Sequence, residues 1–242
     1  MKYNRYAKKA VLAMIVLGLL YAGITSVFGV QGATNIDVGD TSRANLTNFT
    51  SSQSTAVQAG NVTEMNISGQ AITNHWAGFY GEVSGNLTLG DSSGNVFYDW
   101  SGIGPPEGEV FASNASTLNW SGIGCANAAE ITAIEGSLGI TAGTDPDDIA
   151  GTYSNNNHPS FNVGTVSGIS GCNSTNTYVN SAPSTDAFYQ ILLTDSNGYP
   201  VYTTLINDTE QGFDTNTHDF QLLVGESETV GTTTLYFFIE LS

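Results

Sequence analysis

The stretch from His75 to Trp100, HWAGFYGEVSGNLTLGDSSGNVFYDW, constrains the fold more than any other part of the chain. Apolar and aromatic residues recur at alternate positions on both sides of the turn Asp91-Ser-Ser-Gly-Asn, which is typical of strands that lay one face on a core. A closely similar turn, Asp195-Ser-Asn-Gly-Tyr, recurs near the C-terminus. We therefore expect a β-hairpin with a neighbouring strand, and the same turn again between two later strands.

Further runs of β-branched and aromatic residues complete a mainly β chain. We expect strands at about 56–68, 76–83, 86–90, 95–100, 108–113, 160–166, 187–195, 200–206, 218–224 and 233–241. Apolar residues spaced by three and four predict a helix over 126–138, and Asp145 followed by Pro predicts a second helical turn. The fold class that follows is an antiparallel, Ig-like β-sandwich over 56–242 with a helical insert at about 126–153.

Charge is divided sharply along the chain. Four of the five basic residues precede residue 10, and all 22 acidic residues lie from Asp37 onward with Arg43 as the last basic residue. The part after the hydrophobic segment therefore has 22 acids against one Arg, a formal net charge of −21. Such a surface repels phosphate backbones, which excludes nucleic acid as a partner.

The N-terminus predicts export. Ala10 to Val30 carries no charge and follows the basic residues, so residues 1–32 form a hydrophobic helix that is either a signal peptide or a membrane anchor. Cleavage after Gly29 or Gly32 is compatible with small residues there. The polar segment 33–55 is then expected to tether an extracellular or cell-surface domain. Lys9-Ala10-Val11-Leu12 also resembles the processing site of archaeal type IV pilin precursors, an alternative that stays open.

Nine Asn-X-Ser/Thr acceptor motifs all fall on the exported side. These glycosylation candidates are Asn45, Asn48, Asn61, Asn66, Asn86, Asn114, Asn119, Asn173 and Asn207. The only two cysteines, Cys125 and Cys172, have no His at metal-ligand spacing, so in an exported protein a disulfide is the expected pairing.

Signals for chemistry are weak. The weak calcium candidates are Asp91, Asp145, Asp147, Asp148 and Asp195, each with a turn or helix cap as the simpler interpretation. The carboxylates considered for a glycan hydrolase are Glu82, Asp99, Glu107 and Glu109, for which solvated positions are the simpler interpretation. The three histidines, His75, His158 and His218, are expected at surfaces or turns. The tryptophans, which we expect in the core rather than on a sugar-stacking platform, are Trp76, Trp100 and Trp120.

Four segments of the chain resemble a group of uncharacterised exported archaeal β-sandwich surface proteins. They are WAGFYG at 76–81, the run from Asn86 to Trp100, PPEGEVFAS at 105–113, and the tail with LLTDSNGYPVYTTLI and a final aromatic strand. The resemblance implies no activity. We expect a non-catalytic cell-surface protein, structural or interacting with cell-envelope partners or with itself. The alternatives are a type IV pilin-like filament subunit and a secreted glycan hydrolase.

Overall fold

The computed structural model describes residues 29–43, 54–56, 58–69, 71–100, 107–227 and 232–241. Within them the chain is mainly β, and every paired strand is antiparallel to its partner. The strands are β1 (Gln31–Gly32), β2 (Trp76–Gly81), β3 (Leu87–Gly90), β4 (Val96–Trp100), β5 (Gly108–Ser113), β6 (Gly124–Cys125), β7 (Phe161–Val163), β8 (Val166–Ile169), β9 (Ser174–Asn176), β10 (Tyr189–Thr194), β11 (Pro200–Leu205), β12 (Glu210–Gln211), β13 (Thr217–His218), β14 (Phe220–Gly225) and β15 (Tyr236–Leu241). The helices are the 3₁₀ turn η2 (Trp120–Gly122), α2 (Ala128–Leu138) and α3 (Ile149–Thr152).

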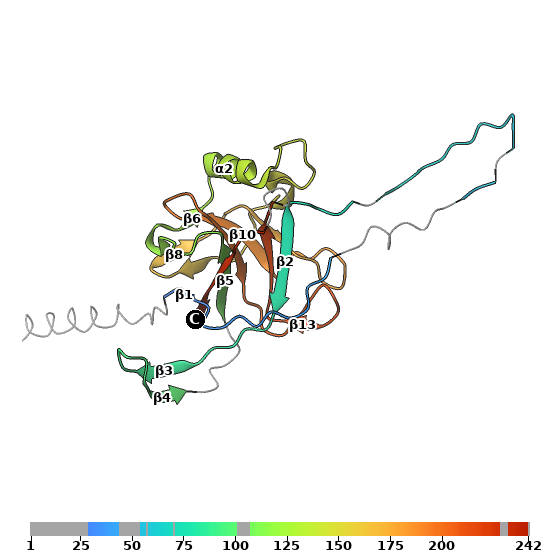
Figure 1. The fold of residues 1–242 in the computed structure, drawn as a ribbon. Coiled ribbons are helices and arrows are strands. Elements are labelled where there is room, and N and C mark those ends of the chain that lie inside the picture. The colour runs from blue at the N-terminus through green and yellow to red at the C-terminus, as the bar shows by residue number, and fades with distance from the viewer. Residues whose placement is uncertain are drawn as a thin grey trace, which may run out of the picture.

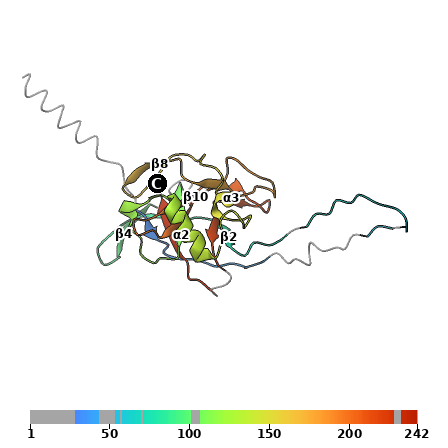
Figure 2. The ribbon, with the colours of Figure 1, turned by 90° about the horizontal axis from the view of Figure 1, so that it is seen from above.

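The main sheet runs in the order β1-β15-β5-β11-β10-β6, and β9 also pairs with β10. A second sheet consists of β14 and β2, and three further pairs are β3–β4, β7–β8 and β12–β13. Figure 1 shows β5, β10 and β2 together in the body of the molecule, and Figure 2 shows α2 crossing above the strands. The expected helical insert is confirmed as α2 and α3.

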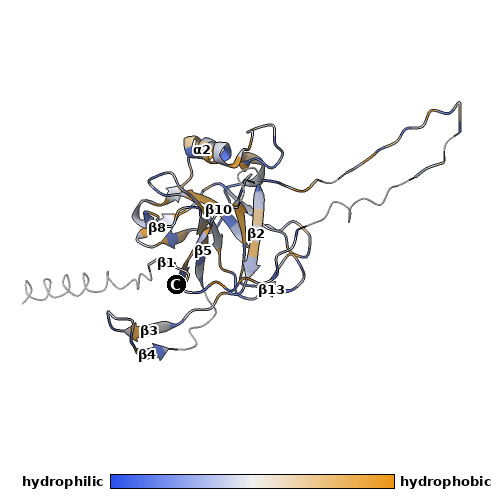
Figure 3. Ribbon diagram, in the orientation of Figure 1, coloured by the Kyte–Doolittle hydropathy of each residue, from blue (hydrophilic) through white to orange (hydrophobic). Residues whose placement is uncertain are grey.

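The central strands of the main sheet are covered on both faces. Ile191, Leu192 and Leu193 of β10 are consecutive, and all three are fully buried. Leu192 packs in a cluster with β14, α2 and α3, whereas Ile191 and Leu193 pack with β7 and β8 on the other face. A strand buried on both sides needs a continuous apolar run rather than alternation. Figure 3 shows the hydrophobic colour this gives to β10.

A buried glutamine joins the main sheet to the second sheet. Gln190 of β10 donates from Nε2 to the carbonyl oxygens of Gln221 (2.6 Å) and Phe188 (2.8 Å), and its Oε1 accepts the backbone N–H of Leu223 at 2.7 Å. Two backbone groups of β14 point toward the main sheet rather than toward a paired strand, and the Gln190 side chain is their hydrogen-bond partner. Buried polar groups need such partners, so this residue fixes the distance and register between the two sheets.

The expectation that the whole of His75 to Trp100 packs on a core is wrong for the β3–β4 hairpin. β2 does pair with β14 and packs its Trp76 and Phe79 against the core. The hairpin instead projects from the body (Figure 1), with Val96 61% exposed and Phe97 84% exposed. The alternating pattern predicts the strands correctly, but it does not determine whether another part of the chain packs on their apolar face.

Three strand predictions also need correction. Residues 58–69 contain no strand, and Val62 and Ile67 there are exposed, because β-propensity does not form a strand without a partner. The single strand expected at 160–166 is the hairpin β7–β8, which turns at Gly164 with φ +56°. Residues 168–184, where we expect no strand, include β9, which pairs with β10.

The polar segment expected as a tether does not separate the hydrophobic segment from the domain. Strand β1 lies before that segment and already pairs with β15, with Gln31 opposite Ile239 and Gly32 opposite Phe238. The chain later returns to the body, where Arg43 donates a hydrogen bond to Asn74 Oδ1 at 3.2 Å. The described residues 54–56, 58–69 and 71–73 between Arg43 and Asn74 thus belong to an excursion whose two ends meet at this contact (Figure 1).

Among the described residues, no helix is long and apolar enough to cross a membrane. The hydrophobic segment Ala10 to Val30 lies outside them except for its last two residues. The expected N-terminal helix therefore stays a prediction.

Candidate functional site

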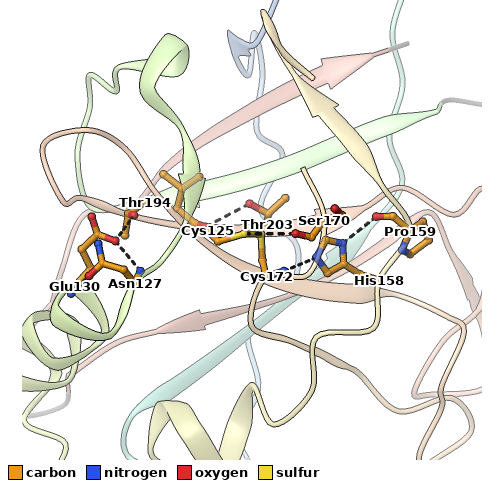
Figure 4. Close-up of a disulfide and its surroundings, with 10 residues drawn as sticks. Cys125, Asn127, Glu130, His158, Pro159, Ser170, Cys172, Thr194 and Thr203 are labelled. Carbon is orange, nitrogen blue, oxygen red and sulfur yellow. Dashed lines mark hydrogen bonds between the residues drawn. A yellow bond between two sulfur atoms is a disulfide. The ribbon is translucent and has the colours of Figure 1, made fainter. Parts of the chain in front are cut away.

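The predicted disulfide is confirmed. Cys125 and Cys172 are bonded, with their Cα atoms 4.9 Å apart (Figure 4). Cys125 ends β6, which pairs with the C-terminal end of β10, and Cys172 lies two residues before β9, which pairs with the N-terminal end. Between them, Leu192 donates its N–H to Asn173 O, and its carbonyl accepts the N–H of Ala126. The disulfide thus joins two short strands that share one edge of β10.

Helix α2 begins immediately after this disulfide. The Asn127 side chain accepts hydrogen bonds from the backbone N–H groups of Ala129 and Glu130, which is a good helix N-cap. Glu130 Oε2 in turn accepts from Asn127 N at 2.8 Å and from Thr194 Oγ1 at 2.9 Å (Figure 4). One carboxylate therefore closes the cap and ties the helix to β10.

His158 supports the other half of the disulfide. Its Nε2 accepts the backbone N–H of Cys172 at 3.0 Å, and its Nδ1 lies 2.8 Å from the carbonyl oxygen of Pro159 (Figure 4). Because a backbone N–H can only donate and a carbonyl can only accept, these contacts assign the proton to Nδ1. His158 therefore holds the backbone beside Cys172 in place, from a loop as expected.

The other two histidines each lie beside one carboxylate. His75 Nδ1 is 3.2 Å from Asp147 Oδ1, and Asp147 also accepts a hydrogen bond from Thr73. Burial acts to raise the pKa of Asp147, but the bonds from Thr73 and His75 outweigh it and hold that pKa below its ordinary value. His218 Nε2 is 2.9 Å from Asp214 Oδ1. Within the described ranges, each of these histidines is thus paired with one carboxylate.

The calcium candidates lie in three parts of the fold, namely two turns and the segment that ends at Asp148, and hydrogen-bond donors of the chain account for each. Asp91 and Asp195 occupy the turns of β3–β4 and β10–β11, as the turn interpretation predicts. Asp148, not Asp145, caps α3 through Gly151 N at 2.6 Å, so this helix begins three residues later than expected. Over the described ranges, no group of three or more His, Cys, Asp or Glu residues is placed to hold a metal ion.

The carboxylates considered for hydrolysis are not brought together. The side chains of Glu82, Asp99 and Glu107 are exposed, as expected. Glu109 is only 7% exposed, so the expectation of a solvated position is wrong for this residue. Its place two residues before the buried Phe111, on the same face of β5, was the available sequence signal.

Glu109 has a partner that sequence reasoning missed. It lies opposite Glu240 of β15 in the strand register, and Glu240 is also 7% exposed. Glu240 Oε2 accepts the backbone N–H of Gly164 at 2.7 Å. Burial, and then the nearby Glu240 carboxylate, raises the pKa of Glu109 to about 8, and burial raises the pKa of Glu240. With no Lys or Arg after Arg43, a proton is what neutralises this pair.

The tryptophans do not form one platform. Trp76 packs in the cluster on one face of the main sheet, and its Nε1 donates to Asp147 O at 2.7 Å. Trp120 packs on the opposite face between Phe111 and Phe238. These two are half-buried and pack against the core as expected, whereas Trp100 lies on the projecting hairpin and is 47% exposed, so the expected core position is wrong for it.

Of the seven glycosylation candidates within the described residues, five lie at exposed positions. Those with exposed side chains are Asn61, Asn66, Asn86, Asn114 and Asn119. Asn173 and Asn207 are half-buried, and Asn45 and Asn48 lie outside the described residues. The geometry thus permits modification at the five exposed positions without unfolding the sheet.

No protein-family model, no curated protein and no solved structure matches this chain.

Proposed function

We propose that the chain is an exported, non-catalytic cell-surface protein with a structural or interaction role. The observation that carries the proposal is the Cys125–Cys172 disulfide, which fixes one edge of β10. Disulfides form and persist in oxidising compartments outside the cytosol. The division of charge agrees, with basic residues ahead of Ala10 to Val30 and acidic residues after it.

The proposal includes an anchored form and a released form. Ala10 to Val30 either stays as a membrane anchor or is removed by cleavage. Cleavage after Gly29 leaves β1 on the edge of β15, whereas cleavage after Gly32 removes both residues of β1 from the sheet. We therefore propose that cleavage after Gly29 produces the released form. The partners are cell-envelope components or further copies of the chain, on a strongly acidic surface that keeps the body soluble.

The finer fold assignment is part of the same proposal. An antiparallel main sheet with β14 and β2 packed on one face supports an Ig-like sandwich, and the uncharged run from Ala10 to Val30 supports a hydrophobic helix before it. We also propose that the chain is related to the exported archaeal β-sandwich surface proteins that it resembles in sequence. This relation implies no activity.

A pilin-like filament subunit is a second candidate, favoured by the position of β1. Only Gly29 and Val30 separate the described strand from the rest of the hydrophobic segment, and Val30 already packs against the core. A body joined this closely to a hydrophobic helix suits a subunit whose helices assemble together. Cleavage between Lys9 and Ala10 is the outcome that distinguishes this candidate.

A secreted hydrolase is a third candidate, favoured by the Glu109–Glu240 pair. Two carboxyl groups of which one holds a proton at neutral pH resemble the acid and base of a glycosidase. A glycan screen with the wild-type chain and with Glu109→Gln tests it. Turnover that the substitution abolishes would replace the non-catalytic proposal.

N-terminal sequencing of the protein from its native host tests the main proposal. An intact Met1 in membranes indicates the anchored form, an N-terminus at Val30 in the medium indicates the secreted form, and an N-terminus at Ala10 in filaments indicates the pilin-like form. Full-length protein recovered from the cytosol with two free thiols would contradict all three.

A further inference from the structure

The β3–β4 hairpin presents an apolar face that the described residues leave open. Leu89 pairs with Tyr98, so their side chains share one face, and the Tyr98 ring packs against that of Trp100 at 4.8 Å. These three residues are 50%, 56% and 47% exposed. Thr88 and Asp99 form the next pair and therefore occupy the opposite face. The hairpin is thus amphipathic.

Such a hairpin needs a covering surface. An isolated two-stranded hairpin is at best marginally stable in water, and contiguous exposed apolar residues usually mark an interaction site. Phe97, which lies at the register shift of the hairpin, is also exposed, at 84%.

The hydrophobic segment and the hairpin leave the body at the same end of β15. Because β1 runs antiparallel to β15, with Gln31 opposite Ile239, the chain before Gln31 heads toward the Leu241 end. Gly85, just before β3, lies against the side chain of that same Leu241. In both Figure 1 and Figure 2 the hairpin projects on the side of the body where β1 lies.

The folded body begins directly where the hydrophobic segment ends, because β1 follows Val30. The 33–55 segment follows β1 rather than preceding it, and Arg43 bonds to Asn74 where the excursion closes. An anchored chain therefore holds its folded body, and the base of this hairpin, against the bilayer surface.

We propose that the hairpin lays its Leu89, Tyr98 and Trp100 face on the outer surface of the bilayer that holds the anchor, an inference that rests on the proposed anchored form. Trp and Tyr favour the membrane–water interface, where one side of the ring is apolar and the other is hydrated. The hairpin has no basic residue, so its binding depends on apolar contact and suits uncharged headgroups. Asp99 faces away, and the turn itself supplies hydrogen-bond donors to Asp91.

A second copy of the chain is the less favourable occupant. Each exported part has a formal net charge of −21, from 22 acids and one Arg, so two bodies brought face to face repel each other. A bilayer of zwitterionic lipid presents no such repulsion. The charge of the body thus favours the lipid surface.

The test uses the full-length chain in phosphatidylcholine vesicles, with and without bromine atoms in the upper part of the acyl chains. Bromine quenches tryptophan emission only at close range. Trp100→Phe isolates the signal of the hairpin, and Trp120→Phe is the matched control because Trp120 packs between Phe111 and Phe238 inside the body. Tyr98→Ser provides a second, non-tryptophan variant on the same face.

The proposal expects bromolipid to remove most of the Trp100 emission, so that Trp100→Phe loses most of the quenching and Trp120→Phe retains it. Tyr98→Ser should weaken the quenching. Vesicles that carry the chain but leave Trp100 unquenched overturn the hairpin proposal and leave the anchor intact. If an aqueous quencher reaches Trp100 less well only when the vesicles carry more protein per unit area, a second copy covers the hairpin. That result also overturns the proposal. A chain that fails to float with vesicles overturns the anchoring and this proposal together.

Discussion

Glu109 and Glu240 lie opposite each other on β5 and β15, both buried, and Glu240 accepts a hydrogen bond from the Gly164 N–H. Two carboxylates in this position repel each other unless one is protonated. The pair lies on the same face as Phe111 and Phe238, beside the edge where β1 joins the sheet. Its protonation state therefore affects the part of the body next to the hydrophobic segment.

This pair predicts that stability falls as pH rises. The folded state keeps Glu109 protonated up to a pKa of about 8, whereas the unfolded chain releases the proton near 4.5. The stabilisation is therefore fully present below pH 4.5 and is lost as pH rises through 8. At about 1.4 kcal/mol per unit, the loss across this window is on the order of 4 kcal/mol. Urea unfolding from pH 4.5 to 9 measures it.

Glu109→Gln should flatten that profile and make the chain more stable than wild type at pH 8. Glu107→Gln, two residues away and exposed, is the control and should follow the wild-type profile. Parallel profiles for wild type and Glu109→Gln would show that the pair does not share a proton.

Removal of the disulfide should lower stability markedly. Cys125 and Cys172 are 47 residues apart, and a loop of that size corresponds to about 4 kcal/mol of unfolding free energy in the chain-entropy model. The double substitution to Ala, compared with wild type by urea unfolding, measures the loss. Reduction of the wild-type chain is the control and should give a similar value. A loss below about 1 kcal/mol would mean that β6 and β9 hold to β10 without the bond.

The two Asp turns provide a matched pair of substitutions. Asp91 and Asp195 each accept the N–H groups two and four residues ahead, but Asp195 is 2% exposed and also accepts the N–H of Asn119 at 3.1 Å. Asp195→Ala should cost about 2 to 3 kcal/mol because buried donors lose their partner. Asp91→Ala should cost clearly less, since water replaces the carboxylate. Equal losses in thermal unfolding would contradict the role of burial.

Gln190→Leu should separate the main sheet from β14. The substitution leaves the N–H of Leu223 and the carbonyl oxygen of Gln221 without their partner, at about 1 to 3 kcal/mol for each buried group. Hydrogen exchange of the Leu223 amide should rise together with the loss of stability. Gln58→Leu in the exposed excursion is the control. An unchanged exchange rate at Leu223 would show that the bond from Gln190 does not hold β14.

Local sequence was sufficient for most of the strands and for the disulfide. Turn chemistry at Asp91 and Asp195, helix spacing in 126–138 and an even pair of cysteines are signals within a few residues, or a count. The turns and the helix were confirmed because backbone conformation at a turn or cap depends mainly on its own side chains, and the disulfide was confirmed because the chain has only two cysteines to pair.

Sequence by itself thus determined the mainly β character, the repeated turn, the helical insert and the cysteine pairing, and it indicated the division of charge on which export is proposed. Only the tertiary structure decided which faces are covered. It buried Glu109 against Glu240, joined β1 to the sheet before the polar segment, and left the aromatic face of β3–β4 open. The physical reason is that burial depends on partners far away in the chain, and a period of two in the sequence does not specify which partner, or whether one is present.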